Sequence, residues 1–283
     1  MDEVNEHLKG YRVGRPIGRG ARSVVYEVWR KGDERRLAAK YVAVREEADR
    51  NIVRHLENEY RVLCRLHEGG DGKSTQGIVQ PVELRKIRRF FKLRAACLIL
   101  EWVEGKSLAD VRDYRLGDLV SIFEQVCDSL MHVHRKGLVH ADLKPDNIVV
   151  GPALCVKLID FGFAAPIGRK LRGLKGTWGY LAPEQAGGEL SAQTDVFNLG
   201  AAMYWVFTGD KLPAIVPQGG DRRGFMPAGD LPLTPPRKLR PELPGELSEL
   251  IMRCCEANPA ERPAMGAVKR MLHNLSLRCS SVT

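Results

Sequence analysis

Long apolar runs are missing from this 283-residue sequence. No stretch approaches the roughly 20 apolar residues that a membrane-spanning helix needs, so no membrane segment is expected. The first residues, Met1 to Val4, are acidic and lack the apolar stretch of a signal peptide. Together these absences predict a soluble, cytoplasmic protein.

Metal-binding and disulfide spacings are missing as well. The seven cysteines are scattered, and the one close pair, Cys254 and Cys255, is adjacent and does not have the spacing of a metal clip. An odd number of scattered cysteines predicts reduced thiols. The sequence has neither a zinc-finger spacing nor a basic repeat interleaved with aromatics, so nucleic-acid binding is not expected.

Positive charge is what the sequence has in excess. The formal net charge is +9, while 44% of residues are hydrophobic and 28% charged, an ordinary composition for a globular protein. Such an excess favours anionic partners, among them nucleotides, acidic lipids and acidic peptides. The basic residues form short clusters, such as Lys86–Arg89 and Arg169–Lys175, for which solvated faces of a folded domain are the first interpretation.

The first hundred residues carry the pattern of strands with one helix. Turn residues separate five apolar runs that we predict to be strands: Tyr11–Ile17, Val24–Arg30, Leu37–Val44, Val79–Leu84 and Ala95–Trp102. Between the third and fourth runs, Glu46–His67 has helical periodicity. The apolar residues of that helix fall near one face: Ile52, Leu56, Tyr60, Leu63 and Leu66.

The remainder of the chain is mainly helical in pattern. A short linker at Glu104–Ser107 precedes four predicted helices: Leu116–Lys136, Thr194–Thr208, Leu247–Ala257 and Met265–Leu275. The proline-rich stretch Pro213–Pro244 is expected to be a surface loop, neither strand nor helix. The sequence therefore predicts an α+β fold with a β-rich part containing one main helix, followed by a mostly helical part.

Two features of the β-rich part are suited to phosphate. Gly18 and Gly20 lie in a turn between two strands, where backbone amides can approach phosphate oxygens because no Cβ blocks them. Many strand turns carry two glycines, so this signal alone is weak. Lys40 lies in an apolar strand, which is costly unless the ammonium is paired or meets an anion, and Glu59 on the following helix is a candidate partner. A lysine that reaches the surface is the alternative interpretation.

Two loops carry residues suited to acid–base and metal chemistry. His140–Asn147 lies between an amphipathic helix and a strand, and can present Asp142 to a hydroxyl and Asn147 to a metal. Asp160 ends an apolar strand and precedes Phe161 and Gly162, which suits a hard oxygen ligand for Mg²⁺. Each could be an ordinary turn, but the two in this order favour one site.

These motifs, in this order, resemble the eukaryotic-type protein kinase family from about Tyr11 to Leu272. The family's set is a Gly-rich loop, a strand lysine, a helical glutamate, a catalytic loop, Asp-Phe-Gly and Ala-Pro-Glu, the last being residues 182–184 here. Asp195 is similar to the buried aspartate that supports the catalytic loop. Arg262 is similar to the arginine that pairs with the Ala-Pro-Glu glutamate, here Glu184.

The resemblance implies a bilobal protein-kinase fold and a single domain over residues 1–283. The β-rich lobe would span about 8–102, the hinge about 101–107 and the helical lobe about 108–275. The compact domain and the Glu-Gln pair after Ala182-Pro183 look like bacterial serine/threonine kinases. The sequence carries no signal of oligomeric state.

The resemblance also implies a role for each motif residue. Lys40 would hold the α- and β-phosphates of ATP, positioned by Glu59, and Asp142 would deprotonate the hydroxyl of a protein substrate. Lys144 would steady the transferring phosphoryl group, with Thr177 beside both. Asn147 and Asp160 would hold Mg²⁺ or Mn²⁺. Lys144 and Thr177 are typical of the class that acts on serine and threonine.

ATP would lie between the lobes. Leu100 would be the gatekeeper beside the adenine, which the backbone of Glu101 and Val103 would bind. The full set of residues expected around the nucleotide and its metal is Ile17, Gly18, Arg19, Gly20, Val25, Ala38, Lys40, Leu100, Glu101, Val103, Ser107, Asn147 and Asp160.

One departure from the family pattern concerns regulation. The family's His-Arg-Asp is His140-Ala141-Asp142 here, and the missing arginine normally pairs with a phosphate on the activation loop. From Asp160 to Glu184 the hydroxyl residues are Thr177 and Tyr180 alone, and neither is an obvious switch site. We therefore expect activity that does not depend on phosphorylation of this loop.

Two alternative functions fit these motifs less well. A pseudokinase would typically have lost Lys40, Asp142, Asn147 or Asp160, and all four are present. A small-molecule phosphotransferase would generally lack the Ala-Pro-Glu segment and its arginine. Within the kinase interpretation, the basic loop Arg169–Lys175 suggests a preference for acidic peptides, although a solvated charge run explains it more simply.

Overall fold

The computed structural model describes residues 2–20, 22–69, 75–111, 113–171, 176–212 and 233–280. The chain divides into two compact units. Unit 1 comprises Met1–Gly70, Ile78–Glu104 and Asp160–Gly162, and unit 2 comprises Asp71–Gly77, Gly105–Ile159 and Phe163–Thr283. Within the described residues, none of the helices combines the length and the hydropathy of a membrane-spanning segment.

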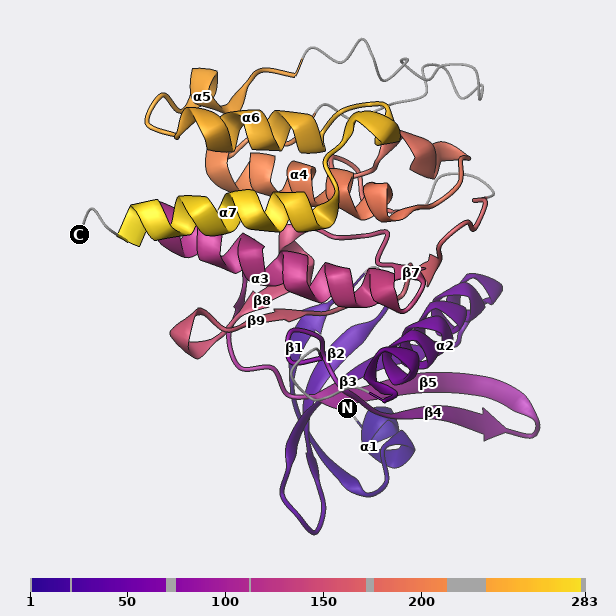
Figure 1. The fold of residues 1–283 in the computed structure, drawn as a ribbon. Helices are drawn as coiled ribbons and strands as arrows, with labels where there is room; N and C mark the ends of the chain where they lie inside the picture. The colour runs from indigo at the N-terminus through magenta and orange to yellow at the C-terminus, as the bar shows by residue number, and fades with distance from the viewer. Residues whose placement is uncertain are drawn as a thin grey trace. The chain divides into compact units, whose positions relative to one another are not determined.

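Unit 1 is an antiparallel sheet with two helices (Figure 1). Five strands pair in the order β1-β2-β3-β5-β4. The elements of unit 1 are α1 (Asp2–His7), β1 (Tyr11–Arg19), β2 (Val24–Arg30), β3 (Arg36–Ala43), α2 (Glu47–His67), β4 (Pro81–Arg89) and β5 (Lys92–Glu101).

Strand β3 shows how the sequence forms this sheet. Its side chains alternate between the two faces, and Leu37, Ala39 and Tyr41 are buried on one of them. The apolar side of α1, with Val4 and Leu8, belongs to the same buried cluster. Helix α2 packs on β3, β4 and β5 through its own apolar stripe. The stripe differs slightly from the predicted one, because Val53 is buried where Ile52 was expected.

Unit 2 is mostly helical (Figure 1). Its helices are α3 (Leu116–Arg135), α4 (Ala192–Thr208), α5 (Pro236–Leu239), α6 (Gly245–Cys254) and α7 (Met265–Ser280). Helix α3 lies against α7, and α4 lies against α6. Short strands complete the unit: β6 (Lys106–Ser107), β7 (Leu138–Val139), β8 (Ile148–Val150), β9 (Val156–Leu158) and β10 (Ala165–Pro166). They pair as β6-β8-β9 and as β10-β7.

The α+β class predicted from the sequence is confirmed, and several details differ. The strands expected after Asn147 and before Asp160 are present as β8 and β9, whereas helix α1 and strands β6, β7 and β10 were not predicted. Helix α6 ends at Cys254, three residues before its predicted end, because Asn258 and Pro259 begin a separate short turn. Of the predicted loop Pro213–Pro244, residues 213–232 lie outside the described residues. The prediction is wrong at Pro236–Leu239, where a proline at the first helical position begins α5.

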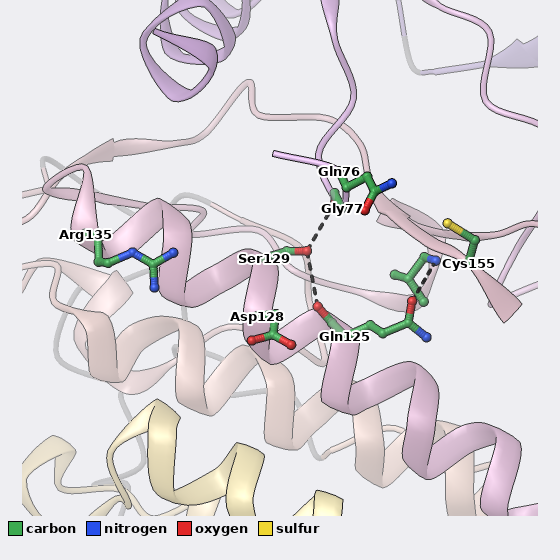
Figure 2. A pocket seen from close by; sticks show the side chains of 8 residues that line it. Gln76, Gly77, Gln125, Asp128, Ser129, Arg135 and Cys155 are labelled. Carbon is green, nitrogen blue, oxygen red and sulfur yellow. Dashed lines mark hydrogen bonds between the residues drawn. The ribbon is translucent and has the colours of Figure 1, made fainter. Parts of the chain in front are cut away.

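Gln125 of α3 holds the turn between β8 and β9. Its amide donates to the carbonyl of Leu154 at 2.9 Å and accepts from the Val156 amide at 3.2 Å. One turn along the helix, the Ser129 hydroxyl donates to the carbonyl of Gly77 (Figure 2). A Cβ at residue 77 would lie 2.1 Å from that hydroxyl, so the approach requires glycine. A pocket of about 360 Å³ lies here, lined by none of the site residues predicted from the sequence.

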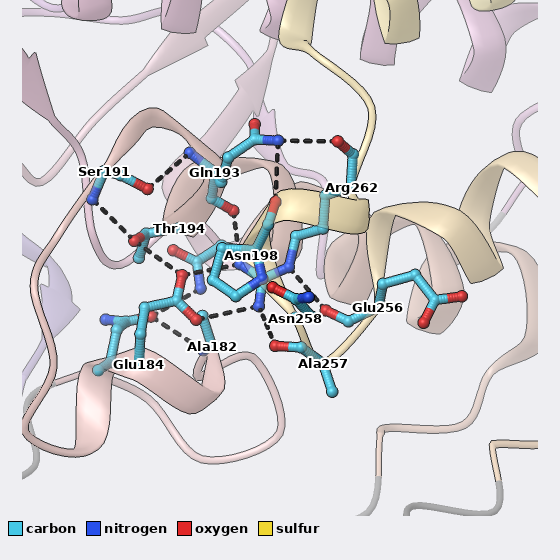
Figure 3. Close-up of polar contacts among 12 residues, drawn as sticks. Ala182, Glu184, Ser191, Gln193, Thr194, Asn198, Glu256, Ala257, Asn258 and Arg262 are labelled. Carbon is cyan, nitrogen blue, oxygen red and sulfur yellow. Dashed lines mark hydrogen bonds and ion pairs between the residues drawn. The ribbon is translucent and has the colours of Figure 1, made fainter. Parts of the chain in front are cut away.

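Arg262 joins three segments of unit 2 through a buried guanidinium (Figure 3). It forms two parallel hydrogen bonds with the Glu184 carboxylate, at 2.7 and 3.0 Å. Its other donor positions bond the backbone carbonyls of Glu256, Gln193 and Ala257, at 2.7, 2.8 and 3.0 Å. The planar fork of arginine suits this arrangement, and lysine cannot reproduce it.

We predict that Arg262→Lys lowers the free energy of unfolding by about 3 kcal/mol or more, because the largely buried carboxylate of Glu184 and three backbone carbonyls lose donors. Urea unfolding, followed by circular dichroism, measures the change. Arg278→Lys is the matched control, since Arg278 pairs with Glu246 at the exposed surface and its replacement should change stability little. An Arg262→Lys protein as stable as the wild type would contradict this account.

Candidate functional site

Five of the residues expected around the nucleotide share one face of the unit 1 sheet. Directly opposed residues of antiparallel strands point to the same side, and the register opposes Gly18 to Val25, Val25 to Lys40 and Ala38 to Leu100. Ala38 and Lys40 are two residues apart on β3 and therefore share that side. It is the side opposite to the buried cluster of Leu37, Ala39 and Tyr41.

Lys40 lies in a cluster of three charged side chains within unit 1. Its ammonium is 2.9 Å from Glu59 Oε2 and 3.0 Å from Asp160 Oδ1. The Glu59 side chain is 1% exposed, whereas that of Asp160 is 40% exposed. The lysine–glutamate pair expected from the sequence is thus present, and the carboxylate of Asp160 completes it while staying accessible to a ligand.

Burial and charge act against each other in this cluster. Burial alone would lower the pKa of Lys40, but the charges of Glu59 and Asp160 outweigh it and the pKa is raised. Burial raises the pKa of Glu59, and the Lys40 ammonium opposes that shift. Lys40 is therefore a fixed positive charge at neutral pH, held by two carboxylates of which one is accessible.

The glycine turn between β1 and β2 is closed by its own backbone. The Gly20 amide donates to the Ser23 carbonyl at 2.9 Å, so this amide is engaged within the turn. Arg22 pairs with Glu46 and Asp49 at the start of α2. Arg19 ends β1, and Ile17 beside it is 41% exposed on the same strand. Ala21 lies outside the described residues.

Residues on each side of the boundary between the two units, at Glu104 and Gly105, form defined hydrogen bonds within their own unit. In unit 1 the Glu101 amide donates to the Gln80 carbonyl and the Glu101 carboxylate accepts from the Gln80 amide, at 3.0 and 2.9 Å. Val103 is half-buried in the segment after β5. In unit 2 the Ser107 hydroxyl donates to the carbonyl of Pro145 and accepts from the Ala109 amide, both at 3.1 Å. Ser107 therefore supports the loop that follows residue 144.

Unit 2 brings Asp142, Lys144 and Thr177 together. The Thr177 hydroxyl donates to Asp142 Oδ1 at 2.8 Å and accepts from the Lys144 ammonium at 2.9 Å. The same ammonium is 3.7 Å from Asp142 Oδ2. Asp142 is 6% exposed. A carboxylate, a cation and a hydroxyl are therefore fixed in one hydrogen-bonded group, and a carboxylate so positioned is suited to remove a proton from a hydroxyl.

Asn147 is oriented by the same loop. Its side-chain nitrogen donates to the carbonyl of Asp142 at 2.9 Å, and its backbone carbonyl accepts from the Ile159 amide at 3.0 Å. With the nitrogen anchored, the amide oxygen is the atom left to act as a hard ligand. Asn147 belongs to unit 2 and Asp160 to unit 1. Carboxylate and amide oxygens suit Mg²⁺, and their joint use of one ion stays a prediction.

Asp195, at the start of α4, binds the backbone of the loop that carries Asp142. Its carboxylate accepts the backbone amides of His140 and Ala141, at 2.9 and 2.8 Å, and contacts His134 Nε2 at 2.8 Å. The side chain is fully buried. Burial would raise the pKa of this carboxyl, but these partners outweigh burial, and the pKa lies below its ordinary value. The stability that Asp195 contributes is therefore present at neutral pH and is lost as pH falls through the lowered folded-state pKa.

Gln185 and Asn198 also support this loop, and sequence reasoning did not identify them. The Gln185 amide nitrogen donates to the carbonyl of Ala141 at 2.8 Å. Its oxygen accepts from the Ala182 amide and from Asn198 Nδ2, at 3.0 and 2.9 Å. Ala141 has a positive φ of 61°, which an alanine adopts only when its surroundings hold it. The polar residue immediately after Ala182-Pro183-Glu184 was the one available signal.

The sequence matches known proteins over most of its length. The sequence model described as "Protein kinase domain" matches residues 11–274. The chain is 32% identical over 274 residues to serine/threonine-protein kinase PknA of Mycobacterium tuberculosis, covering 90% of this chain and 58% of that protein. It is 29% identical over 271 residues to serine/threonine-protein kinase pkn2 of Myxococcus xanthus, covering 89% of this chain and 31% of that protein. The chain thus spans less than two thirds of the length of these relatives.

Proposed function

Because the chain belongs to the protein kinase family, we propose that it transfers the γ-phosphate of ATP to serine and threonine hydroxyls of protein substrates. The hydrogen-bonded group of Asp142, Lys144 and Thr177 carries this proposal. The serine/threonine class is supported by the relatives, whose names state it. The Glu184–Arg262 pair favours a protein substrate over a small molecule, by the resemblance given above.

Asp142 is proposed as the base. Its Oδ1 accepts the Thr177 hydroxyl, and a carboxylate has further lone pairs with which to take the proton of a substrate hydroxyl. Lys144, 2.9 Å from the same threonine, places a positive charge beside that hydroxyl and would stabilise charge on the transferring group. Because Thr177 bonds both residues, its hydroxyl fixes their separation.

The proposed ATP contacts are divided between the units. In unit 1, Lys40 would bind the α- and β-phosphates, and the face carrying Val25, Ala38 and Leu100 would bind the adenine. Asn147 and Asp160 would hold a divalent ion, Mg²⁺ or Mn²⁺, which when bound neutralises charge on the phosphate oxygens. Glu59 would keep Lys40 in place. We propose residues 1–283 as a single kinase domain, with the lobes and hinge expected from the sequence.

We further propose that activity does not depend on activation-loop phosphorylation. Ala141, in place of the family's arginine, is packed with Val139, Ala165 and Leu190 in an apolar cluster. Thr177 is engaged by Asp142 and Lys144, and Tyr180 is 4% exposed. The sequence from Phe163 to Gly176 has no serine, threonine or tyrosine. Residues 172–175 of the basic loop lie outside the described residues, so its proposed preference for acidic peptides rests on sequence alone.

Replacement of Asp142 tests its role as the base. Asp142→Asn should lower kcat for transfer from MgATP to a generic protein substrate by about 10²–10⁴-fold, the usual contribution of a positioned base, while ATP binding persists. Mass spectrometry of the substrate, with calorimetric titration of ATP, measures both effects. Asp128→Asn is the matched control, because Asp128 pairs with Lys269 on exposed surfaces of α3 and α7 and should leave kcat unchanged. A wild-type protein that binds ATP and transfers nothing would support the pseudokinase instead.

Removal of phosphate from the protein tests the proposed independence from phosphorylation. Protein treated with a phosphatase, which is then removed, should phosphorylate a substrate from the first turnovers at the rate of untreated protein. The physical reason is that no phosphate is needed to order a loop whose arginine receptor is replaced by Ala141. The initial rate of substrate phosphorylation is measured, and phosphorylation sites are mapped over residues 160–184. A lag that ends as Thr177 or Tyr180 becomes phosphorylated would contradict the proposal.

A further inference from the structure

The turn between β4 and β5 carries two exposed phenylalanines at its apex. Phe90 is 81% and Phe91 95% exposed, the highest values for large apolar side chains among the described residues. The strands pair up to Arg89 and Lys92, so the phenylalanines alone form the turn. Adjacent apolar side chains so exposed are uncommon on a soluble protein and mark a contact surface.

The backbone of this turn is poorly suited to phenylalanine. Phe90 has a φ of 48° and Phe91 a φ of 63°, and a two-residue hairpin turn with both φ angles positive favours asparagine and glycine. Bulky side chains are strained there. The two phenylalanines therefore contribute neither to core packing nor to favourable turn geometry. We infer that their exposed rings contact a partner outside the chain.

Cations surround the apex. Arg88, Arg89, Lys92 and Arg94 are exposed, and among the described residues none of these four lies within ion-pair distance of a carboxylate. The Arg89 guanidinium lies 5.7 Å from the centre of the Phe90 ring, and Arg88 donates to the carbonyl of Phe91. No acidic residue occurs from Lys86 to Arg94. The hairpin tip, residues 88–94, is thus an apolar apex with a collar of uncompensated positive charge.

We propose that the hairpin tip binds an anionic lipid surface. Rings at the apex would enter the boundary between headgroups and acyl chains, while the arginines and lysine of the collar meet lipid phosphates and carboxylates. A narrow protruding turn can insert into a bilayer, because lipids need no preformed complementary pocket. A specific protein partner would need a complementary face of roughly 800 Å², far larger than a two-residue turn. This surface is separate from the residues proposed for phosphate transfer.

The test is sedimentation of the full chain with vesicles of phosphatidylcholine containing phosphatidylserine, and with vesicles of phosphatidylcholine alone. We expect binding to the anionic vesicles only, weakened by salt. Phe90→Asn with Phe91→Asn should reduce the partition coefficient at least about tenfold, since two aromatic side chains lose their burial. Asparagine suits positive φ, so this variant should melt at or above the wild-type temperature, and a loss of binding cannot be ascribed to unfolding.

Two matched controls separate the tip from general effects. Leu277→Asn removes an exposed apolar side chain of α7, 56% exposed, and should leave binding unchanged. Arg88→Glu with Arg89→Glu should abolish binding, whereas Arg50→Glu with Arg54→Glu, an equal change of net charge on exposed residues of α2, should weaken it only slightly.

Three outcomes would overturn the proposal. The first is wild-type protein that stays in the supernatant with anionic vesicles. The second is a Phe90→Asn, Phe91→Asn variant that binds them as the wild type does. The third is self-association of the free protein in sedimentation velocity, abolished by the same two substitutions, which would assign the tip to a second copy of this chain.

Discussion

The buried charge of Asp195 is the constraint on which the proposed catalytic residues depend. An isolated carboxylate would be too costly to bury, and this one is kept ionised by two backbone amides and by His134. Those amides belong to His140 and Ala141, the residues immediately before Asp142. The chain turns sharply at Ala141, where φ is positive, and Gln185 holds the carbonyl of the same residue. The direction in which Asp142 projects is thus set by partners on α4 and on the segment after Ala182.

The ionic contacts of Arg262 and those of Lys40 serve different purposes, each within its own unit. Arg262 and Glu184 use every donor and both carboxylate oxygens in a closed, buried arrangement that is suited to stability (Figure 3). Lys40, Glu59 and Asp160 form a cluster in which one carboxylate stays accessible. An accessible carboxylate beside a fixed ammonium is suited to a phosphate and its metal ion. The difference in exposure of the acidic partner therefore separates a structural pair from a candidate ligand site.

The elements with periodic apolar patterns, and the motifs that occur in a characteristic order, were predicted from the sequence. The five strands of unit 1 and the long helices follow from apolar patterns, and the Lys40–Glu59 contact followed from the helical face that carries Glu59. Sequence reasoning did not identify Asn198 or His134, because hydrogen bonds of side-chain amides and imidazoles to distant segments leave no pattern in the sequence, and the position of Gln185 directly after Ala182-Pro183-Glu184 does not by itself reveal its partners. It ended the strand before β5 at Leu84, because the charged residues that continue β4 to Arg89 do not alternate with apolar ones. Neither glycine nor asparagine marks the turn at Phe90 and Phe91, so the hairpin was not identified.

The turnover number of an Asp195→Asn protein tests the central claim most directly. Asparagine has nearly the same shape, but its amide nitrogen cannot accept a backbone hydrogen bond, so one of the two amides loses its partner. With the variant shown to be folded by circular dichroism, the account predicts a kcat at least about tenfold lower, equivalent to about 1.4 kcal/mol of transition-state stabilisation. The KM for ATP should change less than kcat, because Lys40 is held by Glu59 and Asp160 within unit 1. A folded variant with the wild-type kcat would show that the position of Asp142 does not depend on the buried charge.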